Sequence, residues 1–254
     1  MRGIPWLWDC LGAVQFYTCL PLPARWPVRF TRVAAWAPVV GLGVGGLLGG
    51  LDEALALAEM PLAPRSALVM AAWVVITGGL HLDGAMDTAD GLAVQDPERR
   101  LAVMADSRSG AFGVMAALIL LLLKTLALAD IPAGRLWVLM GCAGWGRWGQ
   151  QIAILAYPYL KPTGKGAFHK AGLATCPWVW LPNGVLLWGL SLGLTLAGHP
   201  RPAVILALAG PLLALGVGYG LRRVLGGHTG DTYGAVVEWT EAGLLVCLTS
   251  GLLW

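Results

Sequence analysis

Seven long apolar segments constrain the fold of this chain more than any other feature. They cover residues 33–51, 66–82, 111–129, 136–157, 178–198, 202–220 and 235–254. A helix needs about 20 mostly apolar residues to cross a bilayer, and it satisfies its backbone hydrogen bonds internally. We therefore predict an all-α fold, a polytopic integral membrane helix bundle with about seven transmembrane helices.

The composition indicates one membrane domain. Apolar residues make up 57% of the 254 residues and charged residues only 12%, whereas a typical soluble domain has about 25% charged residues. The polar stretches are too short to fold separately, so residues 1–254 are expected to form a single transmembrane domain. It includes residues 1–32 as an interfacial or re-entrant segment, because the apolar stretch 6–20 is too short to span the bilayer.

The basic residues predict how the bundle lies in the membrane. Of the 17 Lys and Arg, Lys124 and Arg147 fall inside apolar segments, and Arg65, Arg135 and Arg201 fall in loops on one side. The remaining twelve fall on the other side. Because basic loops stay in the cytoplasm, we predict a cytoplasmic N-terminus and, with seven spans, an external C-terminus. The net charge of +3 is too small to indicate a nucleic-acid partner.

An acidic segment, H-L-D-G-A-M-D-T-A-D-G at 81–91, directly follows the second apolar segment. On a helix that continues this segment, Asp83, Asp87 and Asp90 share an arc of roughly 60°. Like charges on one face repel, and a hard divalent cation is the usual compensation. The alternative is a solvated helix end. His81 points about 160° away from the three carboxylates, so we expect it to lie beside a ligand site without binding metal.

Two further segments carry acidic residues at helix starts. D-S-R-S-G-A-F-G at 106–113 offers Asp106 to a metal and Arg108 to a phosphate, unless it only caps the following helix. G-G-H-T-G-D-T-Y-G at 226–234 leads into the last apolar segment. If that helix starts near Asp231, then Asp231, Glu238 and Glu241 share an arc of about 80°. The alternative for the two glutamates is an ion pair with Arg147 or Lys124 inside the bundle.

Basic residues complete the set of candidate site residues. Arg147 lies inside the fourth apolar segment, and Lys161 and Lys165 lie in a glycine-rich loop at 161–166. Such a loop suits a polyanionic substrate, although the lysines alone could serve only as orientation signals. The loops after the second, fourth and sixth segments all lie on the predicted cytoplasmic side. Two acidic helix faces with Arg and Lys indicate metal-assisted phosphoryl transfer, in which Mg²⁺ holds phosphate oxygens. The sequence lacks Walker A, Rossmann, G-x-S-x-G and zinc motifs.

Five segments of the sequence together resemble the cobalamin synthase family, also called adenosylcobinamide-GDP ribazoletransferases, and the likeness runs nearly from end to end. They are the segments at 16–23, 78–92, 106–113, 157–166 and 226–235, with Gly146-Arg147 between them. The sequence departs from the family pattern at Cys19, where a basic residue is common, and at Lys161 and Lys165. These differences bear on substrate affinity rather than on the class of reaction.

The resemblance implies a Mg²⁺-dependent membrane transferase that performs the last assembly step of the cobalamin nucleotide loop. The 3′-hydroxyl of α-ribazole, or of its 5′-phosphate, attacks the corrinoid-side phosphorus of adenosylcobinamide-GDP, and GMP leaves. The implied metal ligands are Asp83, Asp87, Asp90, Asp106 and Asp231. The implied catalytic residues are Asp83, Asp90 and Glu238. The implied substrate-binding residues are His81, Arg108, Arg147, Lys161, Lys165 and Thr229.

The resemblance further implies a multi-pass protein of the bacterial inner membrane with its catalytic site on the cytoplasmic side. Its expected partners are the corrinoid-nucleotide and ribazole substrates and membrane lipid. A homo-oligomer and an association with other cobalamin-pathway enzymes both stay open. One alternative is a CDP-alcohol phosphotransferase, but Gly91 is not followed by the x-x-Ala-Arg of that motif. The other is a cation-coupled transporter, whose site would lie near the midplane between repeats.

Overall fold

The computed structural model describes residues 5–161 and 165–249, and these residues form a bundle of α-helices. No strand is present in the described ranges, where Tyr159 and His228 form an isolated parallel bridge. The helices are α1 (Pro5–Tyr17), α2 (Ala37–Leu57), α3 (Leu62–Thr77), α4 (Leu80–Ala93), α5 (Pro97–Val103), α6 (Ala111–Asp130), α7 (Arg135–Ala156), α8 (Lys165–Ala174), α9 (Trp180–Leu196), α10 (Pro200–Leu225) and α11 (Gly230–Cys247); a short 3₁₀ helix covers Val33–Ala35.

The apolar segments became the long helices of the bundle. Within the described residues, three helices, α2, α6 and α10, are long and apolar enough to cross a membrane, and α3 with α4 passes the same test as a bent pair. Leu118, Leu122 and Leu126 of α6 are exposed on its outer side, where lipid rather than water is the compatible solvent. The predicted all-α membrane bundle is confirmed. The number of crossings and the cytoplasmic position of the N-terminus stay predictions.

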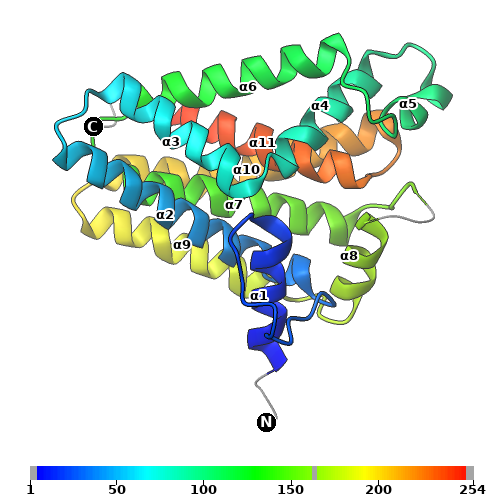
Figure 1. Cartoon of the computed structure of the whole chain (residues 1–254), viewed down its shortest axis with the longest axis horizontal. Coiled ribbons are helices and arrows are strands. Elements are labelled where there is room, and N and C mark those ends of the chain that lie inside the picture. Colours follow the sequence, from blue (N-terminus) through cyan, green and yellow to red (C-terminus); the bar gives the residue numbers. More distant parts are fainter. Residues whose placement is uncertain (1–4, 162–164, 250–254) are drawn as a thin grey trace.

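Helix α7 lies in the middle of the bundle and packs against α2, α9, α10 and α11 (Figure 1). Its glycines allow these close contacts. A Cβ atom on Gly146 would lie 2.9 Å from Glu241 Cγ in α11, and one on Gly141 would lie 2.6 Å from Leu206 in α10. Small residues let membrane helices approach closely where apolar burial alone gives little driving force. As a result, α7 is enclosed on all sides.

One end of the bundle is held by a buried ionic cluster that joins four helices. Arg135 of α7 binds Asp52 of α2 through two hydrogen bonds, of 2.7 and 2.9 Å. Arg65 of α3 lies 3.1 Å from the same carboxylate, and Arg135 also donates to Leu128 O of α6 at 2.7 Å. A bidentate guanidinium satisfies both carboxylate oxygens where water is excluded. The helices α5 and α8 lie at the opposite end (Figure 1).

A sharp elbow separates the second apolar segment from the acidic helix. Helix α3 ends at Thr77, α4 begins at Leu80, and their axes differ by 90°. Gly78 and Gly79 between them adopt φ values of 60° and 67°, a left-handed conformation that glycine takes without a side-chain clash. The expectation that the acidic helix continues the preceding span is therefore wrong. The elbow turns α4 toward α11 and α6, against which it packs.

Candidate active site

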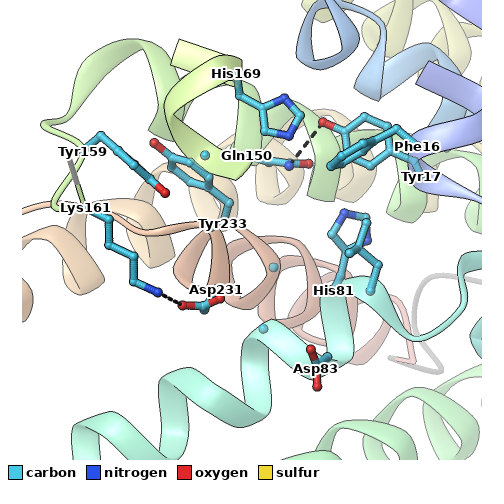
Figure 2. A pocket seen from close by; sticks show the side chains of 15 residues that line it. Phe16, Tyr17, His81, Asp83, Gln150, Tyr159, Lys161, His169, Asp231 and Tyr233 are labelled. Carbon is cyan, nitrogen blue, oxygen red and sulfur yellow. Dashed lines mark hydrogen bonds and ion pairs between the residues drawn. The ribbon is translucent and has the colours of Figure 1, made fainter. Parts of the chain in front are cut away.

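A cavity of about 230 Å³ lies where α1, α4, α7, α8 and α11 meet the loop after α7. Figure 2 shows its side chains, with Asp83 and Asp231 on one side and aromatic rings on the other. Its lining includes Phe16, Tyr17, His81, Asp83, Gln150, Tyr159, Lys161, His169, Asp231 and Tyr233. Of the residues predicted from sequence, His81, Asp83, Lys161 and Asp231 therefore meet here.

Backbone contact between α4 and α11 brings the two acidic segments together. A Cβ atom on Gly84 would lie 2.6 Å from Asp231 O, and one on Gly234 would lie 2.7 Å from His81 O. Both distances are too short for any residue but glycine at these two crossing points. Asp83 and Asp231 are 148 positions apart in the numbering, yet they border one cavity. The 81–91 and 226–234 segments, far apart in the sequence, therefore each place one carboxylate at the same cavity.

The start of α11 holds Asp231 in place. Thr229 caps the helix by accepting a hydrogen bond from Thr232 N, and its own hydroxyl donates to Asp231 Oδ2 at 3.2 Å. Lys161 Nζ donates to the same carboxylate oxygen at 3.0 Å. A carboxylate in the first turn is also stabilised by the positive end of the helix dipole. Thr229 is completely buried, so it orients Asp231 instead of lining the cavity.

Asp87 lies among other charges. Asp83, Asp90 and Asp231 are near enough to repel its carboxylate, and Lys161 offsets part of this repulsion. Among the described residues, no three acidic, histidine or cysteine side chains converge into a complete metal cage. Mg²⁺ seldom needs one, since one or two carboxylates, substrate phosphates and water usually complete its octahedron. The oxygen donors of α4 and α11 fit that mode of binding.

Asp90 has a structural partner that the sequence did not indicate. Its two carboxylate oxygens accept hydrogen bonds from Gly110 N at 2.7 Å and Gly113 N at 2.8 Å, at the start of α6. A Cβ atom on Gly110 would collide with this carboxylate, and one on Gly113 would lie 2.5 Å from it. The glycines of the 106–113 motif therefore admit a helix cap supplied by α4.

Asp106 and Arg108 pair with each other at the protein surface. Arg108 Nη2 lies 2.7 Å from Asp106 Oδ2, and 87% of the Arg108 side chain is exposed. Hydrogen bonds from Arg108 lower the pKa of Asp106 to about 2. Neither residue lines the cavity. The structure thus does not bring this pair to Asp83 and Asp231, although both residues were predicted to join that site.

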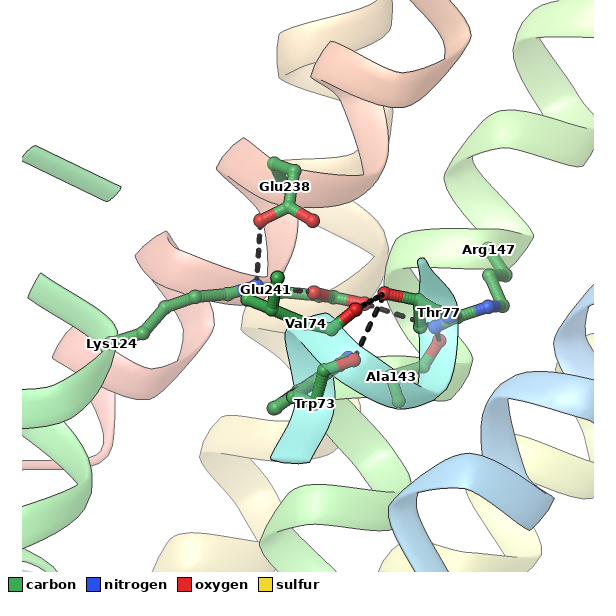
Figure 3. A network of polar contacts seen from close by, with 8 residues as sticks. All are labelled: Trp73, Val74, Thr77, Lys124, Ala143, Arg147, Glu238 and Glu241. Carbon is green, nitrogen blue, oxygen red and sulfur yellow. Dashed lines mark hydrogen bonds and ion pairs between the residues drawn. The ribbon is translucent and has the colours of Figure 1, made fainter. Parts of the chain in front are cut away.

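Glu238 and Glu241 belong to a buried charge network (Figure 3). Lys124 of α6 donates to Glu238 at 2.7 Å and to Glu241 at 2.6 Å, and Arg147 of α7 donates to Glu241 at 3.1 Å. Lys124 also lies 4.5 Å from the ring centre of Trp73. The ion-pair alternative for these glutamates is confirmed. Glu238 and Arg147 do not line the cavity with Asp83.

Several cavity residues were missed from the sequence because they are uncharged. Tyr17 comes from α1, Gln150 from α7, His169 from α8 and Tyr233 from α11. Gln150 follows Arg147 inside an apolar segment, and a polar side chain at such a position is a usable signal. The side chain of Lys165, one of the predicted substrate contacts, lies outside the described part of the structure.

Comparisons with known proteins bear on this site. The family model for cobalamin-5-phosphate synthase matches residues 9–249. The chain belongs to the cobalamin-5-phosphate synthase family. This finding confirms the family predicted from the motifs.

Curated relatives of this chain carry the name adenosylcobinamide-GDP ribazoletransferase. The protein from Trichormus variabilis is 53% identical over 245 residues, which cover 96% of this chain and 97% of the relative. The protein from Thermosynechococcus vestitus is 51% identical over 248 residues, which cover 96% of this chain and 98% of the relative. The protein from Synechocystis sp. is 47% identical over 249 residues, which cover 96% of this chain and 95% of the relative. No solved structure matches the synthase.

Proposed function

We propose that this protein is an adenosylcobinamide-GDP ribazoletransferase. It joins adenosylcobinamide-GDP to α-ribazole, or to α-ribazole 5′-phosphate, and releases GMP, in the last assembly step of the cobalamin nucleotide loop. The observation that carries the proposal is the glycine-mediated contact of α4 with α11, which sets Asp83, Asp231 and Lys161 at one cavity. Phosphoryl transfer needs this combination of oxygen donors and a cation.

We propose that Asp83 and Asp231, which border the same cavity, hold a Mg²⁺ ion together with substrate phosphate oxygens and water, while Asp87 adds negative charge nearby. When bound, the ion would neutralise charge on the diphosphate and fix its orientation. Asp90 and Asp106 are less suited, because the first caps α6 and the second pairs with Arg108. Lys161 contacts Asp231 in the free protein. Its ammonium is placed to turn toward a phosphate oxygen once the substrate and metal compete for that carboxylate.

The reaction forms a bond from the 3′-oxygen of the ribazole to the corrinoid-side phosphorus. It breaks the bond from that phosphorus to the bridging oxygen, which leaves with GMP. The hydroxyl proton passes to a carboxylate. Of the three candidates for this role, Asp90 and Glu238 are engaged by α6 and Lys124, whereas Asp83 borders the cavity. We therefore favour Asp83 as the general base, through the carboxylate oxygen that does not bind the ion.

We also place this chemistry at the cytoplasmic face of the bacterial inner membrane. The cavity is lined by α8 and by Lys161 of the loop before it, and α8 lies at the same end of the bundle as α5 (Figure 1). The segments around α5 and α8 carry many of the Lys and Arg of the chain. Loops rich in basic residues stay in the cytoplasm. A cysteine-accessibility assay on cells can check the assignment, because an added cysteine near Glu98 should react only after the membrane is opened.

The proposed function is tested by incubating the detergent-purified protein with adenosylcobinamide-GDP, α-ribazole and Mg²⁺, with and without a chelator. We expect a cobalamin and GMP in equal amounts, and neither product when the chelator is present. Asp83→Asn should abolish turnover, whereas Asp130→Asn, at the far end of α6, should leave it unchanged. Failure to form a cobalamin under any condition would refute the proposal, and ion flux in liposomes without GMP release would favour a transporter.

A further inference from the structure

Four of the residues that line the cavity beside Asp83 each have one buried polar atom without a hydrogen-bond partner among the described residues. These atoms are His81 Nε2, Gln150 Oε1, His169 Nδ1 and Tyr233 OH. The exposed fractions of these residues are 3%, 4%, 5% and 1%. Buried polar groups are nearly always paired, because an unpaired one loses its hydration without compensation. Four such atoms around one cavity indicate a ligand with several hydrogen-bonding groups.

The same cavity has flat aromatic walls. The Tyr17 ring is stacked with His169 at 6.1 Å and 8°, and with His81 at 5.8 Å and 26°. The Tyr159 and Tyr233 rings are stacked at 6.2 Å and 22°. Figure 2 shows the Tyr17, His81 and His169 rings together in one part of the cavity, and the Tyr159 and Tyr233 rings nearer to Lys161. Aromatic faces with polar atoms at their edges suit a planar heteroaromatic ring.

We propose that this cavity binds the guanine base of the nucleotide diphosphate, a role that rests on the proposed function. The size of the cavity, about 230 Å³, suits a single base and not a corrinoid ring. Guanine has an oxo acceptor together with ring N–H and amino donors along one edge. A benzimidazole bound to ribose has a single acceptor nitrogen and no N–H donor. Guanine can therefore pair with several of the four unpaired atoms, whereas the ribazole base can satisfy one at most.

The protonation of the histidine on α8 agrees with this assignment. Burial lowers the pKa of His169 to about 4, so the ring is neutral at neutral pH. A neutral imidazole has one donor and one acceptor nitrogen, and it carries no positive charge that would favour phosphate over a base. The charged part of the substrate would instead lie toward Lys161 and the acidic residues, at the other side of the cavity.

A second, more open cavity of about 490 Å³ lies on the other side of Asp83. It is lined by Thr77, Gly79, Leu82 and Met86, whereas His81 and Gly84 of α4 line the first cavity. Displacement at phosphorus needs the attacking and leaving oxygens on opposite sides. Guanine in the first cavity thus leaves the second cavity to the corrinoid arm and the incoming ribazole.

The test measures GMP binding to the detergent-purified full chain and, separately, the KM for each substrate. Tyr233→Phe removes only the hydroxyl that has no partner, and Gln150→Met removes the amide. Each should weaken GMP binding by about three- to tenfold, the effect of one hydrogen bond. Each should also raise the KM for adenosylcobinamide-GDP while leaving the KM for α-ribazole unchanged. Tyr219→Phe, an exposed tyrosine on α10, is the matched control. Wild type should bind GMP more tightly than CMP.

Two results would overturn this assignment. If Tyr233→Phe and Gln150→Met raise only the KM for α-ribazole, the cavity holds the acceptor base. If neither variant changes GMP binding or either KM, the cavity holds only water. The proposed function is judged separately, because GMP binding needs no turnover. Absence of turnover in wild type would end that proposal, whereas GMP binding weakened by Tyr233→Phe would still support the base site.

Discussion

Replacing Asp90 by alanine should destabilise the fold, whereas replacing Asp83 should leave stability almost unchanged, although both residues belong to one acidic motif. Asp90 accepts hydrogen bonds from two backbone N–H groups of α6, at 2.7 and 2.8 Å. The Asp83 side chain, by contrast, makes no hydrogen bond or ion pair within residues 5–161 and 165–249. Asp90→Ala should therefore destabilise the fold, and Asp83→Ala should impair only the reaction.

The size of the stability loss in Asp90→Ala follows from these contacts. A hydrogen bond to a charged group contributes about 1.5–3 kcal/mol, and loss of a helix cap costs about 0.5–2 kcal/mol. Because Asp90 is only partly buried, water will replace some of the lost interaction. We expect Asp90→Ala to lower the free energy of unfolding by about 2–4 kcal/mol. Asp90→Asn keeps one acceptor oxygen, so it should lose about half as much unfolding free energy as Asp90→Ala. Asp83→Ala relieves repulsion and should change stability by less than about 0.5 kcal/mol.

The assay is thermal unfolding in detergent, followed by turnover of adenosylcobinamide-GDP at a temperature where every variant is folded. Asp90→Ala should melt about 5–15 °C below wild type and keep measurable turnover when folded. Asp83→Ala should melt with wild type and show no turnover. If Asp90→Ala melts like wild type and is inactive, its carboxylate acts on the substrate and the capping argument is refuted.

Three other predictions concern packing, buried charge and pH. Gly84→Ala would place Cβ 2.6 Å from Asp231 O, so it should cost about 1–3 kcal/mol and reduce turnover. Gly43→Ala is the control, because its Cβ would meet no atom within 4 Å, and it should stabilise the fold by up to about 1 kcal/mol. Equal melting temperatures for Gly84→Ala and Gly43→Ala would contradict the α4–α11 contact. Lys124→Met leaves two buried glutamates with too little positive charge and should lower the free energy of unfolding by about 3–5 kcal/mol. Adding Glu238→Gln should restore part of this stability, and a double variant no more stable than Lys124→Met would argue against the charge network. Burial lowers the pKa of His169 and His228 to about 4, below the unfolded value of about 6.5, so the unfolded chain binds more protons between these pH values. Stability should therefore fall as pH drops from 6.5 to 4, by up to about 3 kcal/mol for each histidine, and His169→Asn should flatten the melting-temperature profile over this range.

The amino-acid sequence by itself determined the helices and the family. The apolar segment predicted at 111–129 became α6 (Ala111–Asp130), and the one predicted at 136–157 became α7 (Arg135–Ala156). Such agreement is expected because the hydrophobicity of a segment adds up locally, whatever it packs against. The motifs identified the family for a similar reason, since they are read along the chain and need no contact to be recognised.

Tertiary structure alone decided what each polar residue does. The carboxylates of Asp83 and Asp90 look equivalent on a helical wheel, yet one borders a cavity and the other caps α6. Tyr17 and Gln150 carry no charge, and they join the site only because α1 and α7 meet α4 there. These roles depend on contacts between residues far apart in sequence. Such contacts follow from how the helices cross, which local hydrophobicity leaves open.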